Sequence, residues 1–173
     1  LNFIAAAWIQ FMTHDWFDHG ANAEGNPIQV PLPAGDAFGS GTMSVQRTQA
    51  DPTRTAADAS KPSTFRNHNT HWWDGSQIYG SSKATSDSIR TFQGGRLKIN
   101  ADGTLPTELL SGKPITGFNN NWWVGLSMLH QIFTKEHNAI ADMLAQKYPG
   151  KSDQWLYDKA RLINAALMAK IHT

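Results

Sequence analysis

The sequence predicts a mainly α-helical domain with long loops. Three segments of the 173-residue chain repeat apolar residues at helical spacing, at residues 1–19, 121–147 and 152–172. The stretches between them are rich in Gly, Pro, Asn, Ser, Thr and Asp and show little periodicity, most clearly over residues 20–69. The chain contains no internal repeat.

The first helical segment carries Phe3, Phe11 and His14 at helical spacing, and Gly20 follows it as a candidate helix stop. No N-cap residue stands ahead of Leu1 in this pattern. We therefore expect the chain to be a fragment of a larger domain.

Residues 20–69 are expected to form a variable, irregular loop that is held by contacts with parts of the protein beyond this chain. A compact aromatic stretch follows over residues 70–80. Ser81 or Ser82 then caps a short helix that is expected to end near Phe92.

A small hairpin over residues 97–105, turning at Asp102 and Gly103, is expected before a second loop. Two core helices complete the chain at residues 121–147 and 152–172. The expected inward-facing residues are Trp122, Leu126, Leu129, Phe133, Ile140 and Leu144 in the first of these helices, and Trp155, Leu156, Leu162, Ile163, Leu167 and Ile171 in the second.

Composition excludes several classes of function. The net charge is +1, with basic and acidic residues interspersed, so no basic stripe suggests nucleic-acid binding. No apolar run approaches the roughly 18–20 residues of a membrane span, although association with a membrane surface stays open. The absence of Cys excludes disulfides, a thiolate haem ligand and an iron–sulfur cluster.

The first helical segment carries polar groups among large apolar residues. Gln10 and His14 are four residues apart and share one helical face, and Asp15 points about a quarter turn away. Either these side chains are satisfied structurally, as a hydrogen-bonded core histidine would be, or they perform chemistry.

Oxygen donors alternate along the aromatic stretch. Thr70, Asp74 and Ser76 offer side-chain oxygens, and Trp72 offers its carbonyl. Alternate residues of an extended backbone point the same way, so this set could wrap a calcium ion, with Asp15 as the second carboxylate. The other interpretation is a tight turn at residues 74–75 whose hydroxyls bond their own backbone.

A third polar cluster, Lys135 to Asn138, lies late in the first core helix. Glu136, His137 and Asn138 are consecutive and point in three directions, so they cannot all face one metal. They are expected to be structural and to form a buried hydrogen-bonding node.

Taken in order, the three segments resemble the peroxidase–cyclooxygenase superfamily, the animal-type haem peroxidases. The resemblance covers the chain nearly end to end, apart from residues 20–69, and includes the Asp-Gly-Ser-x-x-Tyr-Gly run that ends at Gly80. Residues 8–16, 72–76, 121–127 and 169–173 look most like the fatty-acid alpha-dioxygenases and their bacterial relatives.

The resemblance implies a haem-peroxidase-like helical domain that is present here without its proximal half. It implies that His14 is the distal histidine at the haem and Gln10 its companion. The implied calcium ligands, which would brace the distal helix, are Asp15, Thr70, Trp72, Asp74 and Ser76. The proximal histidine and the radical tyrosine of the family belong to a later segment, so none of Tyr79, Tyr148 and Tyr157 corresponds to that tyrosine.

The chain departs from the myeloperoxidase type at three places. Thr13 and Trp122 stand where those enzymes have the carboxylates that form ester bonds to haem, and Asn119 stands near the place of their distal arginine. We therefore expect haem b held without covalent links, and weaker heterolytic activation of peroxide.

These features predict a haem-dependent oxidoreductase that acts on fatty acids or similar lipophilic molecules with oxygen or hydrogen peroxide. A peroxidase of small donors and a non-catalytic, calcium-stabilised extracellular scaffold are the alternatives. A non-haem metal site built from His14, Asp18 and His19 lacks a convincing ligand spacing. The cellular location stays open, with secretion or peripheral membrane association favoured.

Overall fold

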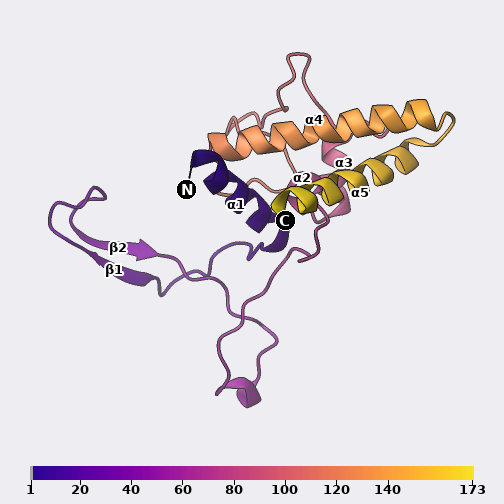
Figure 1. Ribbon diagram of the computed structural model, residues 1–173. Helices are drawn as coiled ribbons and strands as arrows, with labels where there is room; N and C mark the ends of the chain where they lie inside the picture. The colour runs from indigo at the N-terminus through magenta and orange to yellow at the C-terminus, as the bar shows by residue number, and fades with distance from the viewer. Residues whose placement is uncertain (1) are drawn as a thin grey trace. The chain divides into compact units, whose positions relative to one another are not determined.

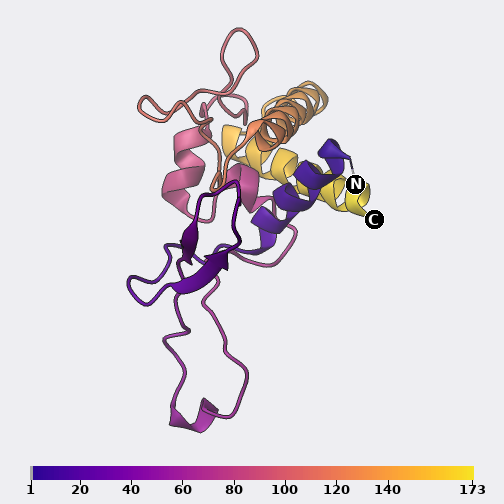
Figure 2. The same ribbon diagram turned by 90° about the vertical axis from the view of Figure 1, so that its left-hand side faces the viewer.

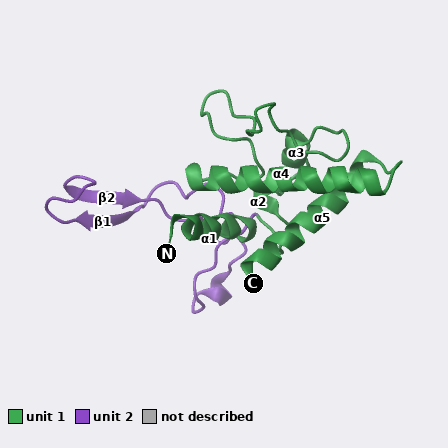
Figure 3. Ribbon diagram, turned by 45° about the horizontal axis from the view of Figure 1, so that its top comes forward, with its two compact units in different colours: residues 1–17, 69–173 green, residues 18–68 purple. Residues whose placement is uncertain are grey.

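The computed structural model describes residues 2–173 and divides the chain into two compact units. The helical unit comprises residues 1–17 and 69–173, and the loop unit comprises residues 18–68 (Figure 3). The helical unit contains all the α-helices of the described chain, which confirms the predicted mainly α class.

Helix α1 (Phe3–Trp16) is shorter than the predicted helix at both ends. Asn2 is its N-cap, because the Asn2 side chain accepts a hydrogen bond of 2.8 Å from the backbone N–H of Ala5. The expectation that this helix has no cap within the chain was therefore wrong. Phe17 is extended, and the N–H of Asp18 bonds to Asn67 instead of continuing the helix.

Helices α4 (Val124–Lys147) and α5 (Asp153–His172) lie side by side (Figure 1). The residue before α4, Trp123, is extended, and Asn121 has a left-handed φ of 53°, so α4 begins three residues later than predicted. The apolar stripe of α4 is buried as expected at Leu126, Leu129, Phe133, Ile140 and Leu144. Trp122 lies outside the helix and is 40% exposed.

The expected inward face of α5 was partly wrong. Leu162, Ile163 and Ile171 are exposed in the structure. The buried residues of α5 are Leu156, Tyr157, Ala160, Asn164, Ala165 and Met168. Most of these residues are three or four positions apart and so share one side of the helix. Ala160, Asn164 and Ala165 were not predicted to face inward, because the prediction considered only large apolar side chains.

Two short helices connect α1 to α4. Helix α2 (Ser76–Tyr79), which was not expected, starts after Gly75 in the left-handed conformation, and α3 (Lys83–Ile89) is capped by Ser82. A Cβ atom on Gly117 would lie 2.2 Å from the backbone nitrogen of Gly80, so only glycine fits where this loop crosses α2.

The predicted hairpin over residues 97–105 is present only as a turn. The N–H of Asn100 bonds to the carbonyl of Thr104, and Gly103, at the predicted turn, has a positive φ. Leu97 pairs with Arg90 in an isolated bridge instead of forming a strand.

The core of the helical unit joins α1, α2, α4 and α5. Phe11 stacks on Phe133 with ring centroids 5.5 Å apart, and Leu126, Tyr79 and Met168 are almost wholly buried beside them. The apolar face of α1 therefore packs on α4 and on the short helix α2, while α5 packs on α4.

A polar node crosses this core. The Nδ2 atom of Asn164 donates to the Tyr79 hydroxyl and to the carbonyl of Phe133. The Tyr79 hydroxyl is 3.0 Å from Nδ1 of His137, and Nε2 of His137 is 2.9 Å from the carbonyl of Gly95. His137 lies in a buried hydrogen-bonded network, and Asn138 pairs with both backbone groups of Leu97.

The loop unit contains an antiparallel hairpin where an irregular loop was expected (Figure 2). Strands β1 (Ile28–Leu32) and β2 (Gly41–Val45) pair Ile28 with Val45 and Val30 with Met43. A 3-10 helix, η1 (Ala56–Asp58), follows. No residue of 18–68 is buried, so the hairpin has no core of its own. Among residues 2–173, no helix has both the length and the apolar character needed to cross a membrane.

Candidate functional site: helix α1 and an oxygen-rich loop

The imidazole of His14 lies on the buried side of α1. Its residue is 6% exposed, and its ring meets the ring of Phe118 edge-on at 4.8 Å. The backbone carbonyl of His14 accepts a hydrogen bond from Nδ2 of Asn69. Phe118 is tied in turn to α2, because its N–H donates to the carbonyl of Gln77. Phe118 therefore packs on the imidazole, and Asn69 fixes the backbone of the same residue.

Gln10 lies one helical turn before His14 and has a fixed amide. Its Oε1 accepts a 2.7 Å hydrogen bond from the indole Nε1 of Trp123, and its Nε2 donates to the carbonyl of Asn121 at 3.2 Å. These two bonds define which end of the amide is oxygen. The second Nε2 hydrogen remains able to donate to another group.

Asp15 is almost fully buried and bonds to the start of α2. Its Oδ1 accepts from the N–H of Ser76 at 2.7 Å and from the Ser76 hydroxyl at 3.0 Å. The same hydroxyl reaches the Asp15 carbonyl at 3.0 Å. Residues 61 positions apart are thus joined by three hydrogen bonds, which fixes the C-terminal turn of α1 beside the aromatic loop.

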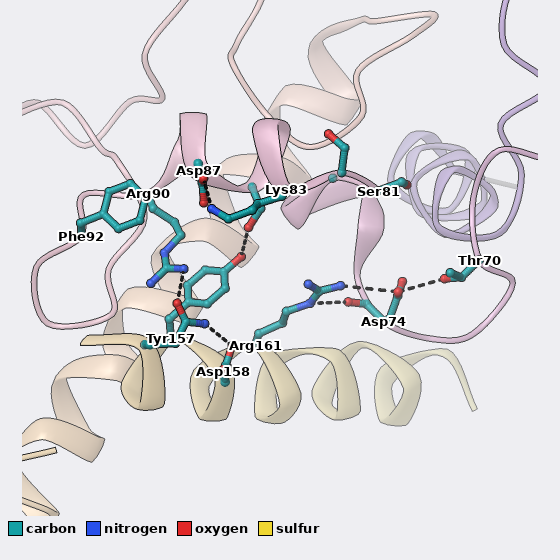
Figure 4. Close-up of a pocket in the computed structure, with 14 residues that line it drawn as sticks. Thr70, Asp74, Ser81, Lys83, Asp87, Arg90, Phe92, Tyr157, Asp158 and Arg161 are labelled. Carbon is teal, nitrogen blue, oxygen red and sulfur yellow. Dashed lines mark hydrogen bonds and ion pairs between the residues drawn. The ribbon is translucent and has the colours of Figure 1, made fainter. Parts of the chain in front are cut away.

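Asp74 is the second carboxylate of this region (Figure 4). Its Oδ2 accepts a 2.9 Å hydrogen bond from the Thr70 hydroxyl and lies 3.5 Å from a guanidinium nitrogen of Arg161. Arg161, on α5, also donates from Nε to the Asp74 carbonyl. The N–H of Asp74 bonds to the carbonyl of Trp72, whose side chain points to solvent.

The structure therefore brings the five predicted ligand residues into two linked pairs, Asp15 with Ser76 and Thr70 with Asp74, and connects Trp72 through its carbonyl. Burial raises the pKa of Asp15 to about 6, and the negative charge of Asp74 acts in the same direction. Within residues 2–173 no group of three or more His, Cys, Asp and Glu side chains could hold a metal. A cation here would depend on two carboxylates together with hydroxyl and carbonyl oxygens.

That donor set fits calcium by its chemistry. Hydroxyl, carboxylate and carbonyl oxygens are hard ligands, and calcium takes about six to eight of them. The Oδ1 atom of Asp74 is buried and has no hydrogen-bond partner within the described residues. The negative charge of Asp74 destabilises ionised Asp15, and a divalent cation bound between the two carboxylates would relieve this repulsion.

The same helix face fits a flat, apolar cofactor held without covalent bonds. Thr13 and Asn119 are neutral residues, so they supply neither a carboxylate for an ester bond nor a positive charge. The Thr13 hydroxyl donates to the carbonyl of Ile9, and the Asn119 amide donates to the carbonyl of Pro114. Trp123 packs against Phe3 with ring centroids 4.7 Å apart, directly beside Gln10. An imidazole and an amide beside aromatic rings are compatible with the distal side of a haem, where hydrogen-bond donors and polarity control how oxygen binds.

Sequence reasoning missed His130 and Arg161. His130, on α4, is fully buried against the edge of the Phe11 ring, and neither ring nitrogen has a hydrogen-bond partner in the part of the chain that the structure describes. Burial lowers the pKa of His130 to about 3, so its imidazole is neutral. His130 lies four residues after the buried Leu126, and this spacing could have placed it in the core.

The sequence matches a known protein family and several known proteins along nearly its whole length. The family model described as animal haem peroxidase matches residues 1–173. Alpha-dioxygenase 2 of Arabidopsis thaliana is 41% identical over 172 residues, which cover 99% of this chain and 26% of that protein. Alpha-dioxygenase PIOX of Nicotiana tabacum is 40% identical over 176 residues, covering 99% and 26%.

Solved structures give a parallel result. The fatty acid alpha-dioxygenase of Arabidopsis thaliana superposes with a TM-score of 0.83 at 38% identity, covering 99% of this chain and 26% of that one. A variant of the Oryza sativa enzyme, crystallised with palmitic acid, also gives a TM-score of 0.83, at 37% identity, covering 99% of this chain and 28% of that one. The chain spans about a quarter of the length of the relatives it matches. It belongs to the animal haem peroxidase family.

Proposed function

We propose that the protein containing this chain is a haem-dependent oxidoreductase that adds oxygen to fatty acids. The observation that carries the proposal is the buried His14, with the half-buried Gln10 one turn before it, on a chain about 40% identical to alpha-dioxygenases along nearly its whole length. A relative crystallised with palmitic acid supports a long-chain fatty acid as the substrate class.

In this proposal His14 and Gln10 form the distal face of the haem pocket. Bound haem supplies a redox-active iron that can react with oxygen or peroxide. The His14 imidazole can accept a proton from a peroxide and return it to the departing oxygen. The free Nε2 hydrogen of Gln10 can donate to a bound oxygen ligand or water, because Trp123 and Asn121 hold the amide in one orientation.

Haem is proposed to be held without ester bonds. Thr13 and Trp122 provide no carboxylate at the positions where the myeloperoxidase type has them. Asn119 likewise provides no guanidinium to stabilise charge separation in the peroxide bond. We therefore propose that this protein cleaves peroxide heterolytically less well than a myeloperoxidase-type enzyme.

Calcium is proposed to bind Asp15, Asp74, Thr70, Ser76 and the carbonyl of Trp72. Its role would be to support the site from outside, because Asp15 is adjacent to His14 in α1. A cation that fixes Asp15 fixes the backbone that aims the imidazole. It would also neutralise two carboxylates that otherwise repel each other.

The test is oxygen uptake by the intact, haem-loaded protein with palmitic acid and no added peroxide. We expect uptake in the wild type, loss of at least tenfold in His14→Ala, and no change in His19→Ala, an exposed histidine of the loop unit that serves as a matched control. Donor oxidation only when peroxide is added would replace the dioxygenase by a peroxidase of small donors. No turnover and no haem absorbance would leave a non-catalytic scaffold instead.

A further inference from the structure

The guanidinium of Arg161, on helix α5, contacts Asp74 at two places (Figure 4). Its Nε donates a 3.1 Å hydrogen bond to the Asp74 carbonyl, and its Nη2 lies 3.5 Å from Oδ2 of the Asp74 carboxylate. The two residues are 87 positions apart, so these contacts form only when the chain folds. One side chain of α5 therefore fixes both the backbone and the carboxylate of a single loop residue.

The two carboxylate oxygens of Asp74 differ in their partners. Oδ2 accepts a 2.9 Å hydrogen bond from the Thr70 hydroxyl and forms the ion pair with Arg161. Oδ1 is buried and has no hydrogen-bond partner within residues 2–173. A carboxylate is planar, so contacts that hold Oδ2 and the backbone also determine where Oδ1 lies. A buried anionic oxygen without a donor is costly, and a cation is the partner that relieves this cost.

The contacts of Arg161 are directed at Asp74. Within residues 2–173, Asp74 is the one carboxylate that forms an ion pair with Arg161. The guanidinium carbon lies over the ring of the buried Tyr79, 5.1 Å from its centroid. The aromatic ring supports the flat guanidinium from one side, which favours the orientation in which Nε and Nη2 both reach Asp74.

We propose that Arg161 is a positioning residue of the calcium site, which holds Asp74 so that Oδ1 is available to the cation. This inference rests on the proposed calcium binding and adds a residue that is not itself a ligand, because a guanidinium has no acceptor atom. Arg161 acts on the cation through Asp74. Donors that hold a ligating carboxylate in this way typically change metal affinity by about 10- to 100-fold.

The positive charge of Arg161 has an opposing effect, because it repels a divalent cation. Arg161 and Asp74 both line a cavity of about 420 Å³, and their side chains are 30% and 34% exposed. Water and salt therefore screen this repulsion, as they do for other partly exposed charges. The orienting contacts act directly on the ligand, so we expect orientation to outweigh repulsion.

The test is calorimetric titration with calcium chloride of the intact, haem-loaded protein after a chelator has removed bound cations. Arg161→Met keeps most of the side-chain length over Tyr79 but loses both contacts with Asp74, and we expect roughly a tenfold or greater loss of calcium affinity. Arg161→Lys, which keeps the charge but has one nitrogen in place of the fork, should lose less. The matched control is Arg96→Met, because Arg96 pairs with Asp142 of α4 and not with the loop.

A second measurement separates positioning from a general loss of stability. Europium(III) replaces calcium at oxygen sites, and its luminescence decay rates in H2O and D2O report how many waters it binds. The difference between the two rates cancels quenching by haem. We expect about one additional bound water in Arg161→Met, because Asp74 no longer presents its oxygen to the ion, and no additional water in Arg96→Met.

The outcomes distinguish this inference from the proposed calcium site. Calcium binding by the wild type, with weaker binding and an added water in Arg161→Met, supports the inference. Unchanged or tighter binding with an unchanged number of waters overturns it and leaves the calcium site standing, even if the chelated variant unfolds at a lower temperature. A wild type that binds no calcium overturns both.

Discussion

The helical unit and the loop unit differ in what holds them together. In the helical unit, apolar faces of four helices enclose a core that is crossed by the hydrogen-bonded Tyr79–His137–Asn164 node. In the loop unit no residue is buried, and Arg54 secures the backbone by donating to the carbonyls of Asp58, Lys61 and Pro62. We conclude that packing determines the first unit and hydrogen bonds near water determine the second, which predicts very different responses to mutation.

The largest expected effect is steric. Gly117→Ala should destabilise the helical unit by about 3 kcal/mol or more, because the new Cβ would lie 2.2 Å from one backbone atom and 2.5 Å from another. Urea unfolding of the intact protein measures this change. The matched control is Gly35→Ala in the loop unit, which meets no atom within 4 Å and should cost about 1 kcal/mol locally for its positive φ. Equal losses in the two variants would contradict the comparison.

Acid should destabilise the helical unit selectively. Burial lowers the pKa of His130 to about 3 and of His137 to about 4, whereas unfolded histidine titrates near 6.5. Below pH 6.5 the unfolded state binds protons that the folded state does not, so stability is complete above pH 6.5 and is lost as the pH falls toward 4. Each histidine adds a slope of up to about 1.4 kcal/mol per pH unit.

Unfolding midpoints in urea at pH 7, 6, 5 and 4.5 measure this slope. The His130→Gln variant should lose part of it, whereas His71→Gln, which alters an exposed histidine, should not. A slope unchanged by His130→Gln would show that this imidazole is not buried and neutral.

Removal of calcium should lower the thermal stability of the protein by a smaller amount, and this loss should depend on the carboxylates of Asp15 and Asp74. Chelation should lower the thermal midpoint of the intact protein, because Asp15 and Asp74 are left to repel each other. In Asp15→Asn the chelator should have little further effect. Asp51→Asn, which alters a partly exposed carboxylate of the loop unit, should respond to the chelator as the wild type does. A wild type that is insensitive to the chelator would argue against calcium.

The smallest effect is expected in the loop unit. Arg54→Ala removes several hydrogen bonds to backbone carbonyls, but these lie close to water and contribute about 1 kcal/mol or less in total. Limited proteolysis should cut residues 51–64 faster, while the thermal midpoint of the helical unit stays within error. A matching fall in that midpoint would show that the two units unfold as one.

The sequence located the helices better than their ends and faces. Periodicity predicted helices at residues 1–19, 121–147 and 152–172, and the structure has them at residues 3–16, 124–147 and 153–172, because the apolar repeat of 3.6 residues is a local property of the sequence. Periodicity did not identify Asn2 as the N-cap of α1, which the structure shows through the hydrogen bond from the N–H of Ala5. It also chose Leu162 and Ile163 for the core, because apolar character alone does not determine which side of a helix meets its neighbour.

At the candidate site, too, the sequence identified individual residues, whereas the contacts between distant residues came only from the structure. Residue types and spacing drew attention to Gln10, His14 and Asp15 but left a structural and a chemical interpretation open, and the family resemblance then favoured a chemical role, which stays a prediction. They could not reveal that Arg161, 87 residues beyond Asp74, bonds to its carbonyl. They also led to the expectation that Tyr79 matches no family radical tyrosine, but only the fold shows that its hydroxyl is aligned with His137.

What the sequence determined by itself is local: where helices form, which segments break them, and which polar groups an apolar helix must satisfy or use. Tertiary structure alone decided which groups meet across long separations, as Ser76 meets Asp15 and His137 meets Tyr79. The physical reason is that helical periodicity arises from neighbours within a few residues, whereas a buried hydrogen bond depends on donors and acceptors that approach only when whole elements pack.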